Sequence, residues 1–428
     1  MQRIHLKAPK GWINDPNGFI YYKGKYHMFY QHFPYAPQWG RMHWGHAVSD
    51  DLANWEHLDI ALFPTKKDDS DGCFSGSAVE HNGKMHLFYT GVHYNEPDPE
   101  NVNCNLNDDF ISAQLHISSE DGFSFDNFSK KATIIPPLIE SKIGDKTHTR
   151  DPKVWKGKDG NWYMILGSTV NHMGRVLFYR SSDLLNWKYI NYASCNDMGW
   201  MWECPDYFET DGQGVLIFSP MDEEKGNQAV CALADFDEKN CTMNISNNIK
   251  YFDYGLDLYA PQSTTDKFGR RIVAAWLRMP EPMENNTIGL FSIPRICEVK
   301  NNHIYFRPHP DIAKKFTVKT NTPDMKKPFM VKTELAENEL ISIGGYIIKR
   351  RNGRIITNRC GVIRGHEEIQ NICETPMLKD GFSLEIYVDE NIIEVFVNNG
   401  EYVITNAVYD LTEKIIVNEN AETYVLEG

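Results

Sequence analysis

Short runs of apolar residues alternate with polar turns along most of the chain, and helical periodicity is scarce. The stretch GFIYYKGKYHMFYQ, from Gly18 to Gln31, has two such runs on either side of a Lys-Gly turn. The same hairpin pattern occurs five times: KGKYHMFYQ from Lys23, NGKMHLFYT from Asn82, DGNWYMILG from Asp159, DGQGVLIFS from Asp211 and FGRRIVAAW from Phe268. The pattern predicts an all-β protein built on a repeated hairpin.

The spacing of these hairpins indicates the repeat unit. Their turn glycines stand at positions 24, 83, 160, 212 and 269, and successive glycines are 59, 77, 52 and 57 residues apart. About sixty residues accommodate four strands and their connections. Five units of this size predict a five-bladed β-propeller over residues 1–300. Unrelated hairpins also resemble one another, so the repeat alone leaves that alternative open.

The pattern changes near residue 300. A polar stretch over residues 301–316, with Pro308 and Pro310, is expected to be a linker. Strand-like alternation follows, as in SLEIYVDE from Ser383 and in IIEVFVNNGEYVIT from Ile392, where an Asn-Asn-Gly turn joins two β-rich runs. Residues 317–428 are therefore predicted to form a β-sandwich domain.

Composition and charge restrict the class of partner. Apolar residues make up 41% of the 428 positions and aromatic residues 12%, and the formal net charge is -14. Such a charge repels polyanions, so no nucleic acid or membrane surface is expected as a partner, whereas a small neutral molecule fits. The first ten residues, MQRIHLKAPK, lack the apolar core of a signal peptide, and the nine cysteines form no Cys-x-x-Cys pair. We expect a cytoplasmic monomer or homodimer with free thiols, and no metal or cofactor.

Three acids share one phase of the repeat. Counting nine residues back from each turn glycine gives Asp15, Phe74, Asp151, Glu203 and Ala260. In a propeller the first strand of each blade lines the central channel, so equivalent positions converge around one axis. Each acid alone has a structural explanation, as part of a turn or of an ion pair. Together they predict a functional pocket, because clustered like charges oppose folding and are seldom kept without a function.

The sequence blocks around these acids resemble glycoside hydrolase family 32, the family of invertases, sucrose-6-phosphate hydrolases and fructanases. The blocks are WINDPNG from Trp12, FSGSAV from Phe74, RDP from Arg150 and WECPD from Trp202, with further similarity in YGLDLYAPQS, AAWLRMP and IEVFVNNGE. The resemblance extends over almost the whole chain. It implies a five-bladed propeller followed by a β-sandwich, which agrees with the repeat count.

The resemblance also implies roles for the acids in a retaining β-fructofuranosidase. Asp15 would be the nucleophile, Glu203 the acid/base, and Asp151 the acid that holds fructosyl hydroxyls. Arg150 would support Asp151 as an ionised group, and Glu203 would need a raised pKa to donate a proton. The positions that match the family's fructose-binding pocket are Asn14, Gln31, Trp39, Phe74, Ser75, Arg150 and Trp276. Cys204 matches a cysteine that tunes the acid, although an inert buried thiol is an equal alternative.

The substrate stays open at this stage. Sucrose, sucrose 6-phosphate and short fructo-oligosaccharides all fit a cytoplasmic enzyme. Arg41 and His43, in the stretch WGRMHW, are predicted near the pocket rim, where one or both would meet the leaving-group sugar or its phosphate; solvated rim residues are the alternative. The rival functions are a fructosyltransferase on the same scaffold and a fructan-binding propeller without catalysis.

Overall fold

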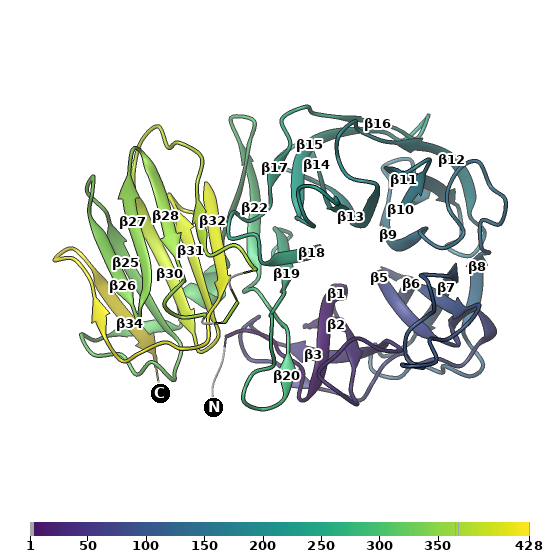
Figure 1. Ribbon diagram of the computed structural model, residues 1–428. Coiled ribbons are helices and arrows are strands. Elements are labelled where there is room, and N and C mark those ends of the chain that lie inside the picture. The colour runs from purple at the N-terminus through teal and green to yellow at the C-terminus, as the bar shows by residue number, and fades with distance from the viewer. Residues whose placement is uncertain (1–3, 364, 367, 428) are drawn as a thin grey trace.

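The computed structural model describes residues 4–363, 365–366 and 368–427, which form a ring of five sheets beside a two-sheet lobe (Figure 1). Within this range the helices are short, a single-turn α1 (Pro310–Ala313) and a 3-10 turn η1 (Lys67–Asp69). The predicted all-β architecture, a five-bladed propeller followed by a β-sandwich, is confirmed. No helix among the described residues has the length and apolar character needed to cross a membrane.

Each blade is one antiparallel sheet that starts with its innermost strand. Blade I contains β1 (Gly11–Tyr22), β2 (Lys25–Phe33), β3 (His43–Ser49) and β4 (Glu56–His57), and blade II contains β5 (Gly72–His81), β6 (Lys84–Tyr94), β7 (Phe110–Ser119) and β8 (Ala132–Ile135). Blade III contains β9 (Arg150–Lys156), β10 (Trp162–Val170), β11 (Met173–Ser181) and β12 (Lys188–Ala193). Blade IV contains β13 (Met201–Thr210), β14 (Gln213–Met221), β15 (Val230–Asp237), β16 (Thr242–Ile245) and β17 (Lys250–Tyr251).

Blade V completes the ring and touches the first blade. It contains β18 (Leu258–Thr265), β19 (Arg271–Leu277), β21 (Leu290–Phe291), β22 (Arg295–Lys300) and β23 (His303–Pro308). The two-residue β20 (Thr287–Ile288) leaves this blade and pairs in parallel with β1. Because β23 pairs with β22, residues 303–308 belong to the propeller sheet although the sequence places them in the linker.

The five turn glycines lie where the repeat predicts them, between the first two strands of each blade. All have positive φ, from 74° at Gly212 to 89° at Gly24, and no atom lies within 4 Å of the position of an added Cβ. Backbone conformation, and not crowding, explains these glycines, since L side chains rarely adopt this region. The hairpin repeat in the sequence therefore marks the blades themselves.

The sandwich is formed by two packed sheets. The larger sheet has the order β24 (Phe316–Lys319), β34 (Glu422–Leu426), β25 (Phe329–Glu334), β30 (Ser383–Asp389), β31 (Ile392–Val397) and β32 (Tyr402–Ala407). The smaller sheet has the order β29 (Ile372–Glu374), β28 (Arg354–Asn358), β27 (Tyr346–Arg351), β26 (Leu340–Ile343) and β33 (Ile415–Ile416).

The two lobes share part of their hydrophobic core. Ile296 and Phe306 of blade V are in the same buried cluster as Tyr387, Phe396 and Val403 of the larger sandwich sheet. Burial of large aromatic side chains on both sides of the boundary favours one fixed arrangement of the lobes. The sandwich is therefore packed directly against blade V.

Candidate active site

A β-bulge interrupts the innermost strand of every blade at the same height. In blade I, the pairs Ile13–His32 and Pro16–Tyr30 flank the bulge, so that two residues of β1 oppose Gln31 alone. The other blades repeat this shift, and the bulged residue pairs are 14/15, 74/75, 151/152, 204/205 and 260/261. A bulge increases the local twist and redirects side chains, which makes this ring of positions suited to a site.

The three predicted acids belong to this ring but not to one equivalent position. Asp151 is the first bulged residue of its blade, Asp15 is the second of its blade, and Glu203 directly precedes its bulge. The nine-residue count from the glycine therefore locates each acid to within one residue. The structure brings them together around Cys204, whose Sγ lies 3.4 Å from Oδ2 of Asp15 and 3.6 Å from Oδ2 of Asp151.

Asp15 is fixed by a short chain of hydrogen bonds. Ser75 Oγ donates to Asp15 Oδ2 at 2.5 Å, and Gln31 Nε2 donates to Ser75 Oγ at 2.8 Å. Beside it, the indole of Trp12 donates to Asn14 Oδ1 at 2.7 Å. The predicted pocket residues Asn14, Gln31 and Ser75 therefore lie next to Asp15, and all three are buried.

Asp151 is held in a strained backbone conformation. Its φ is 66°, its amide donates to Thr90 Oγ1 at 2.9 Å, and its Oδ2 accepts from the amide of Cys204 at 2.9 Å. Non-glycine residues with such φ values cost about 1–3 kcal/mol and persist where surrounding contacts hold them. The neighbouring blades II and IV supply those contacts, so the position of Asp151 is set by three blades.

Glu203 contacts two donors, one on each oxygen. Arg150 Nη2 donates to Oε1 at 2.8 Å, and the Tyr259 hydroxyl donates to Oε2 at 2.6 Å. The predicted ion pair of Arg150 with Asp151 is present, with Nε 4.0 Å from Oδ2, but the shorter contact of Arg150 is with Glu203. The guanidinium thus reaches from β9 to the adjacent strand β13, where Glu203 directly precedes the bulge.

Burial and mutual repulsion raise the pKa values of both aspartates. Desolvation is the largest cause for Asp151, and although Arg150 opposes it, the charges of Glu203 and Asp15 add to it, so that the pKa reaches about 7. Desolvation also raises the pKa of Asp15, while the Ser75 hydrogen bond lowers it. The same burial, with three carboxylates nearby, raises the pKa of the Cys204 thiol well above its ordinary value. The thiol is therefore a donor between two acids and not a nucleophile.

Aromatic rings form the wall beside Asp15. Trp39 packs edge-on against Trp12 and Phe74, with ring centroids 6.3 and 5.5 Å apart, and Trp276 lies 5.8 Å from Trp12. The Nε1 of Trp276 is buried and has no hydrogen-bond partner in the described structure. The predicted pocket residues Trp39, Phe74 and Trp276 thus share one wall, where aromatic faces can pack on sugar C–H groups.

Arg41 lies two residues before the start of β3, and His43 is the first residue of that strand. Arg41 Nη2 forms an ion pair with Asp71 Oδ1 at 3.0 Å, and His93 contacts the other oxygen of that carboxylate at 3.2 Å. His43 Nδ1 is 2.9 Å from the backbone oxygen of Arg41. Among the described residues, neither side chain forms a hydrogen bond or ion pair with the three acids, but the Arg41 side chain is 38% exposed and open to a ligand.

Tyr259 is a site residue that the sequence reasoning did not identify. It directly precedes the bulge of blade V, as Glu203 directly precedes the bulge of blade IV. The signal was present, because Tyr259 immediately precedes Ala260, the fifth position of the nine-residue count. Thr90 gave no such signal, since it comes from the second strand of the neighbouring blade, where its hydroxyl accepts from the Asp151 amide.

No group of three His, Cys, Asp or Glu side chains in the described ranges is arranged to hold a metal ion. The acids instead have donors from Ser75, Arg150 and Tyr259. The arrangement offers two carboxylic acids with raised pKa values, a third acid with fixed oxygens, and an aromatic wall. Such a set can perform acid/base and nucleophilic chemistry on a sugar.

The comparison with known families decides the identity of the scaffold. Residues 5–308 match the model of the glycosyl hydrolases family 32 N-terminal domain, and residues 346–425 match the family's C-terminal domain. The chain belongs to glycosyl hydrolase family 32. It is accordingly a β-fructofuranosidase-type glycoside hydrolase, as the sequence blocks indicate.

Individual members of family 32 are similar over nearly the full chain. The sucrose-6-phosphate hydrolase of Escherichia coli is 33% identical, covering 96% of this chain and 90% of its own length. The raffinose invertase of Escherichia coli is 32% identical, covering 95% and 89%. The solved β-fructofuranosidase of Bombyx mori is 28% identical with a TM-score of 0.83, covering 100% of this chain and 94% of that one, and a mutant of it is solved in complex with sucrose.

Proposed function

We propose that this chain hydrolyses the fructosyl bond of sucrose 6-phosphate and of sucrose with retention of configuration, through a covalent fructosyl-enzyme. The observation that carries the proposal is the cluster of Asp15, Asp151 and Glu203 around Cys204 at the bulge ring. Two carboxyl groups on either side of a glycosidic bond are the requirement of retaining hydrolysis. The names of the relatives support the substrate class.

In the first step the ionised Asp15 attacks the anomeric carbon of the fructosyl unit. The C–O bond to the leaving sugar breaks, and Glu203 transfers its proton to that oxygen. The Ser75 hydroxyl, 2.5 Å from Asp15 Oδ2, stabilises the ionised nucleophile and leaves the second oxygen available for the attack. The Asp151 carboxylate accepts hydrogen bonds from the sugar hydroxyls. These hydrogen bonds become stronger as positive charge develops on the ring.

In the second step Glu203 takes a proton from water, whose oxygen attacks the anomeric carbon and releases Asp15. Glu203 must therefore exist in both protonation states. The Tyr259 hydroxyl suits this requirement, because it is 2.6 Å from Glu203 Oε2 and 3.2 Å from the backbone oxygen of Ser219. It can donate to the ionised Glu203, or accept from the protonated acid while it donates to Ser219.

The proposal extends to the phosphate. Sucrose 6-phosphate carries its phosphate on the leaving glucose unit, and Arg41, a partly exposed cation, follows the wall residue Trp39 by two positions. Its guanidinium Nε is buried and unpartnered in the described structure, while one Nη contacts Asp71. A phosphate bound by Arg41 would compete with Asp71 for the guanidinium. The cytoplasmic location predicted from the sequence is proposed as well, since phosphorylated sugars are found inside cells.

A substrate panel tests the reaction and its specificity. We expect purified protein to release reducing sugar from sucrose 6-phosphate and sucrose, with slower release from kestose and little from inulin or levan. Fructosyl oligomers as the main product at high sucrose would indicate a transferase instead. Binding of these sugars without any product would indicate a lectin-like propeller and contradict the proposal.

The Arg41→Ala variant tests the phosphate contact. We expect the ratio of kcat/KM for sucrose 6-phosphate over sucrose to fall about tenfold, the effect of losing one charge-assisted contact. Arg351→Ala is the matched control, because it removes the same charge from an exposed position in the sandwich. An unchanged ratio in Arg41→Ala would remove Arg41 from the substrate site.

A further inference from the structure

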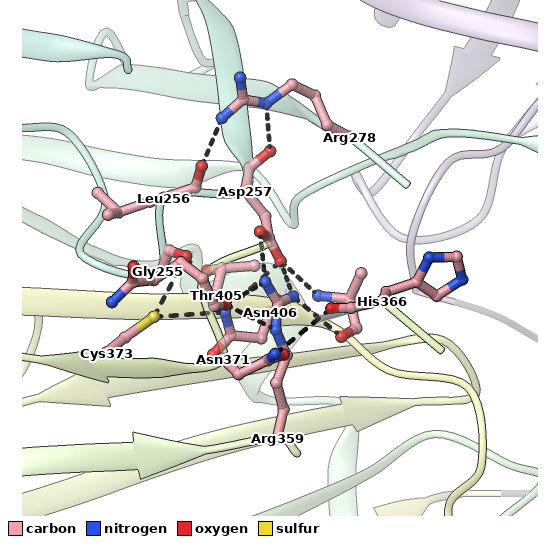
Figure 2. A network of polar contacts seen from close by, with 12 residues as sticks. Gly255, Leu256, Asp257, Arg278, Arg359, His366, Asn371, Cys373, Thr405 and Asn406 are labelled. Atoms are coloured by element: carbon pink, nitrogen blue, oxygen red, sulfur yellow. Dashed lines mark hydrogen bonds and ion pairs between the residues drawn. The ribbon is translucent and has the colours of Figure 1, made fainter. Parts of the chain in front are cut away.

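The β-sandwich reaches the propeller's inner strand through one bidentate ion pair. Arg359, which follows β28, bonds both oxygens of Asp257 through Nη1 and Nη2, the latter at 2.9 Å (Figure 2). The side chain of Arg359 is 0% exposed and that of Asp257 is 12% exposed. Asp257 immediately precedes β18, the strand that carries Tyr259. A sandwich residue is therefore bonded to the start of the strand that contacts Glu203.

The segment Leu256–Asp257 is held from both sides. On the sandwich side, the amide of Ala407 donates to Asp257 Oδ2 at 2.9 Å. On the propeller side, Arg278 donates from Nε to the Asp257 backbone oxygen at 3.3 Å and from Nη2 to the Leu256 backbone oxygen at 2.5 Å (Figure 2). Side chain and backbone of this segment are thus fixed by different lobes.

The backbone of this segment explains why it needs such support. Leu256 has a φ of 63° and Ala260 a φ of 49°, both in the left-handed region that L residues rarely adopt. Tyr259 lies between these two positions. Strained conformations persist only where neighbouring contacts determine them, so the direction of the Tyr259 side chain depends on contacts outside β18.

Two contacts carry the effect from the ion pair to the acid. The Arg278 guanidinium, oriented by the backbone of residues 256 and 257, lies 5.0 Å from the centroid of the Tyr259 ring. The Tyr259 hydroxyl in turn donates to Glu203 Oε2 at 2.6 Å. We propose that Arg359 of the sandwich is a positioning residue for Glu203, acting through Asp257 and Tyr259. The proposal rests on the function of Glu203 as the proton donor.

A purely structural role for Arg359 makes a different prediction. If the ion pair only fastens the lobes together, its loss lowers thermal stability and affects all substrates equally. If it positions Glu203, its loss affects a substrate whose leaving group needs a proton much more than one whose leaving group does not. The measurement of choice is kcat/KM, because it reports the steps up to cleavage and not the later hydrolysis of the intermediate.

The experiment compares Arg359→Lys with the wild type on sucrose and on p-nitrophenyl β-D-fructofuranoside. Lysine keeps the charge but loses the bidentate geometry. We expect kcat/KM to fall about 10-fold for sucrose and less than about 2-fold for the aryl fructoside, a fraction of the full effect of a general acid. An equal loss on both substrates, or a loss of thermal stability alone, would overturn the proposal.

Three further variants test whether the effect of Arg359→Lys depends on the route through Asp257 and Tyr259. Tyr409→Phe removes another hydrogen bond across the same boundary, from Tyr409 to the backbone oxygen of Glu281 at 2.6 Å, and is expected to leave both activities unchanged. Asp257→Asn weakens the same ion pair from the propeller side and replaces Arg359→Lys if that variant does not fold. In a Tyr259→Phe background, Arg359→Lys is expected to cause no further loss; an additive loss contradicts the proposed route.

The same panel separates this proposal from the proposed function. If the wild type hydrolyses neither sucrose, sucrose 6-phosphate nor the aryl fructoside, the assignment of Glu203 fails. If the wild type hydrolyses them and Arg359→Lys shows no dependence on the leaving group, only the role of Arg359 fails.

Discussion

The channel and the boundary between the lobes each hold a group of three acids, which are buried at the boundary and buried or partly buried in the channel. At the boundary, Arg295 bonds Asp253 at 2.9 Å and Glu394 at 2.6 Å, and His5 contacts Glu394 and Asp389 at 2.9 Å each. Two cations, Arg295 and His5, therefore form ion pairs with the three acids Asp253, Glu394 and Asp389.

In the channel, Arg150 contacts Glu203 at 2.8 Å and Asp151 at 4.0 Å, and the donors to Asp15 and to the second oxygen of Glu203 are neutral. Their pKa values differ in part: Arg295 and His5 lower that of the buried Glu394, and burial raises that of Asp253 although Arg295 opposes it, while burial and repulsion raise those of Asp15 and Asp151. Each acid at the boundary has a cation in direct contact. Acids of the site are left with unsatisfied charge that a substrate can use.

The largest expected effect breaks the channel cluster without affecting the fold. We expect Asp15→Asn to lower kcat for sucrose at least about 10⁴-fold, as loss of a nucleophile does. Its melting temperature is expected to stay the same or rise, because one repelling charge is removed from the cluster. The exposed Asp380→Asn serves as the control for charge removal. A large loss of stability in Asp15→Asn would show that this acid also has a structural role.

The boundary cluster is expected to respond in the opposite way. Arg295→Met leaves Asp253 and Glu394 buried without their cation, which is expected to cost about 3–5 kcal/mol of unfolding free energy. Urea unfolding measures the change. Arg307→Met, which breaks the half-buried pair with Glu298, is the matched control and is expected to cost less than about 1 kcal/mol. Similar losses in both variants would contradict the comparison.

His5 makes the boundary sensitive to alkaline pH. Its hydrogen bonds to Asp389 and Glu394 overcome the desolvation that opposes its charge and raise its pKa from 6.5 to about 9. The stabilisation is therefore complete below about pH 6.5 and is lost as the pH rises through 9, up to about 3 kcal/mol. We expect the unfolding free energy of the wild type to fall over this range. In His5→Gln the curve is expected to be flatter, and an identical curve would show that His5 is not the titrating group.

The smallest expected effect concerns the thiol between two acids. Cys204→Ala removes a weak donor to Asp15, which raises the pKa of Asp15 further. The acidic limb of the kcat/KM profile is then expected to move to higher pH, with an activity loss of about 3-fold at neutral pH. Cys360→Ala, at an exposed thiol, is the control. An unmoved acidic limb would mean that Cys204 does not tune the nucleophile.

Much of the fold could be predicted because the repeat depends on local sequence patterns. A turn that needs positive φ favours glycine, so Gly24, Gly83 and their equivalents are visible in the sequence, and they mark the blades. The strand β23 was missed because it is short, ends at Pro308 and is followed by Pro310, as in a linker. Pairing with β22, which is a tertiary property, makes it a strand.

The candidate site was predictable to within one residue. The count from the glycines found Asp15, Asp151 and Glu203, but not that each takes a different place in its bulge. Bulge phase depends on the partner strand, as Gln31 opposite residues 14 and 15 shows, and the partner is not encoded locally. For the same reason the sequence could not show that Arg150 contacts Glu203 more closely than its own neighbour Asp151.

The short parallel strand β20 has a consequence for the motion of the pocket. The backbone pairing that closes the ring is limited to Gly11–Thr287 and Trp12–Ile288, so the first and last blades are joined at this point by a short parallel ladder and not by a full sheet. Trp12, on one side of that ladder, packs against Trp276 of the last blade. Local opening between β1 and β20 is therefore expected to loosen the aromatic wall first. Faster amide hydrogen exchange at Thr287 and Ile288 than in β18 or β19 would detect this opening.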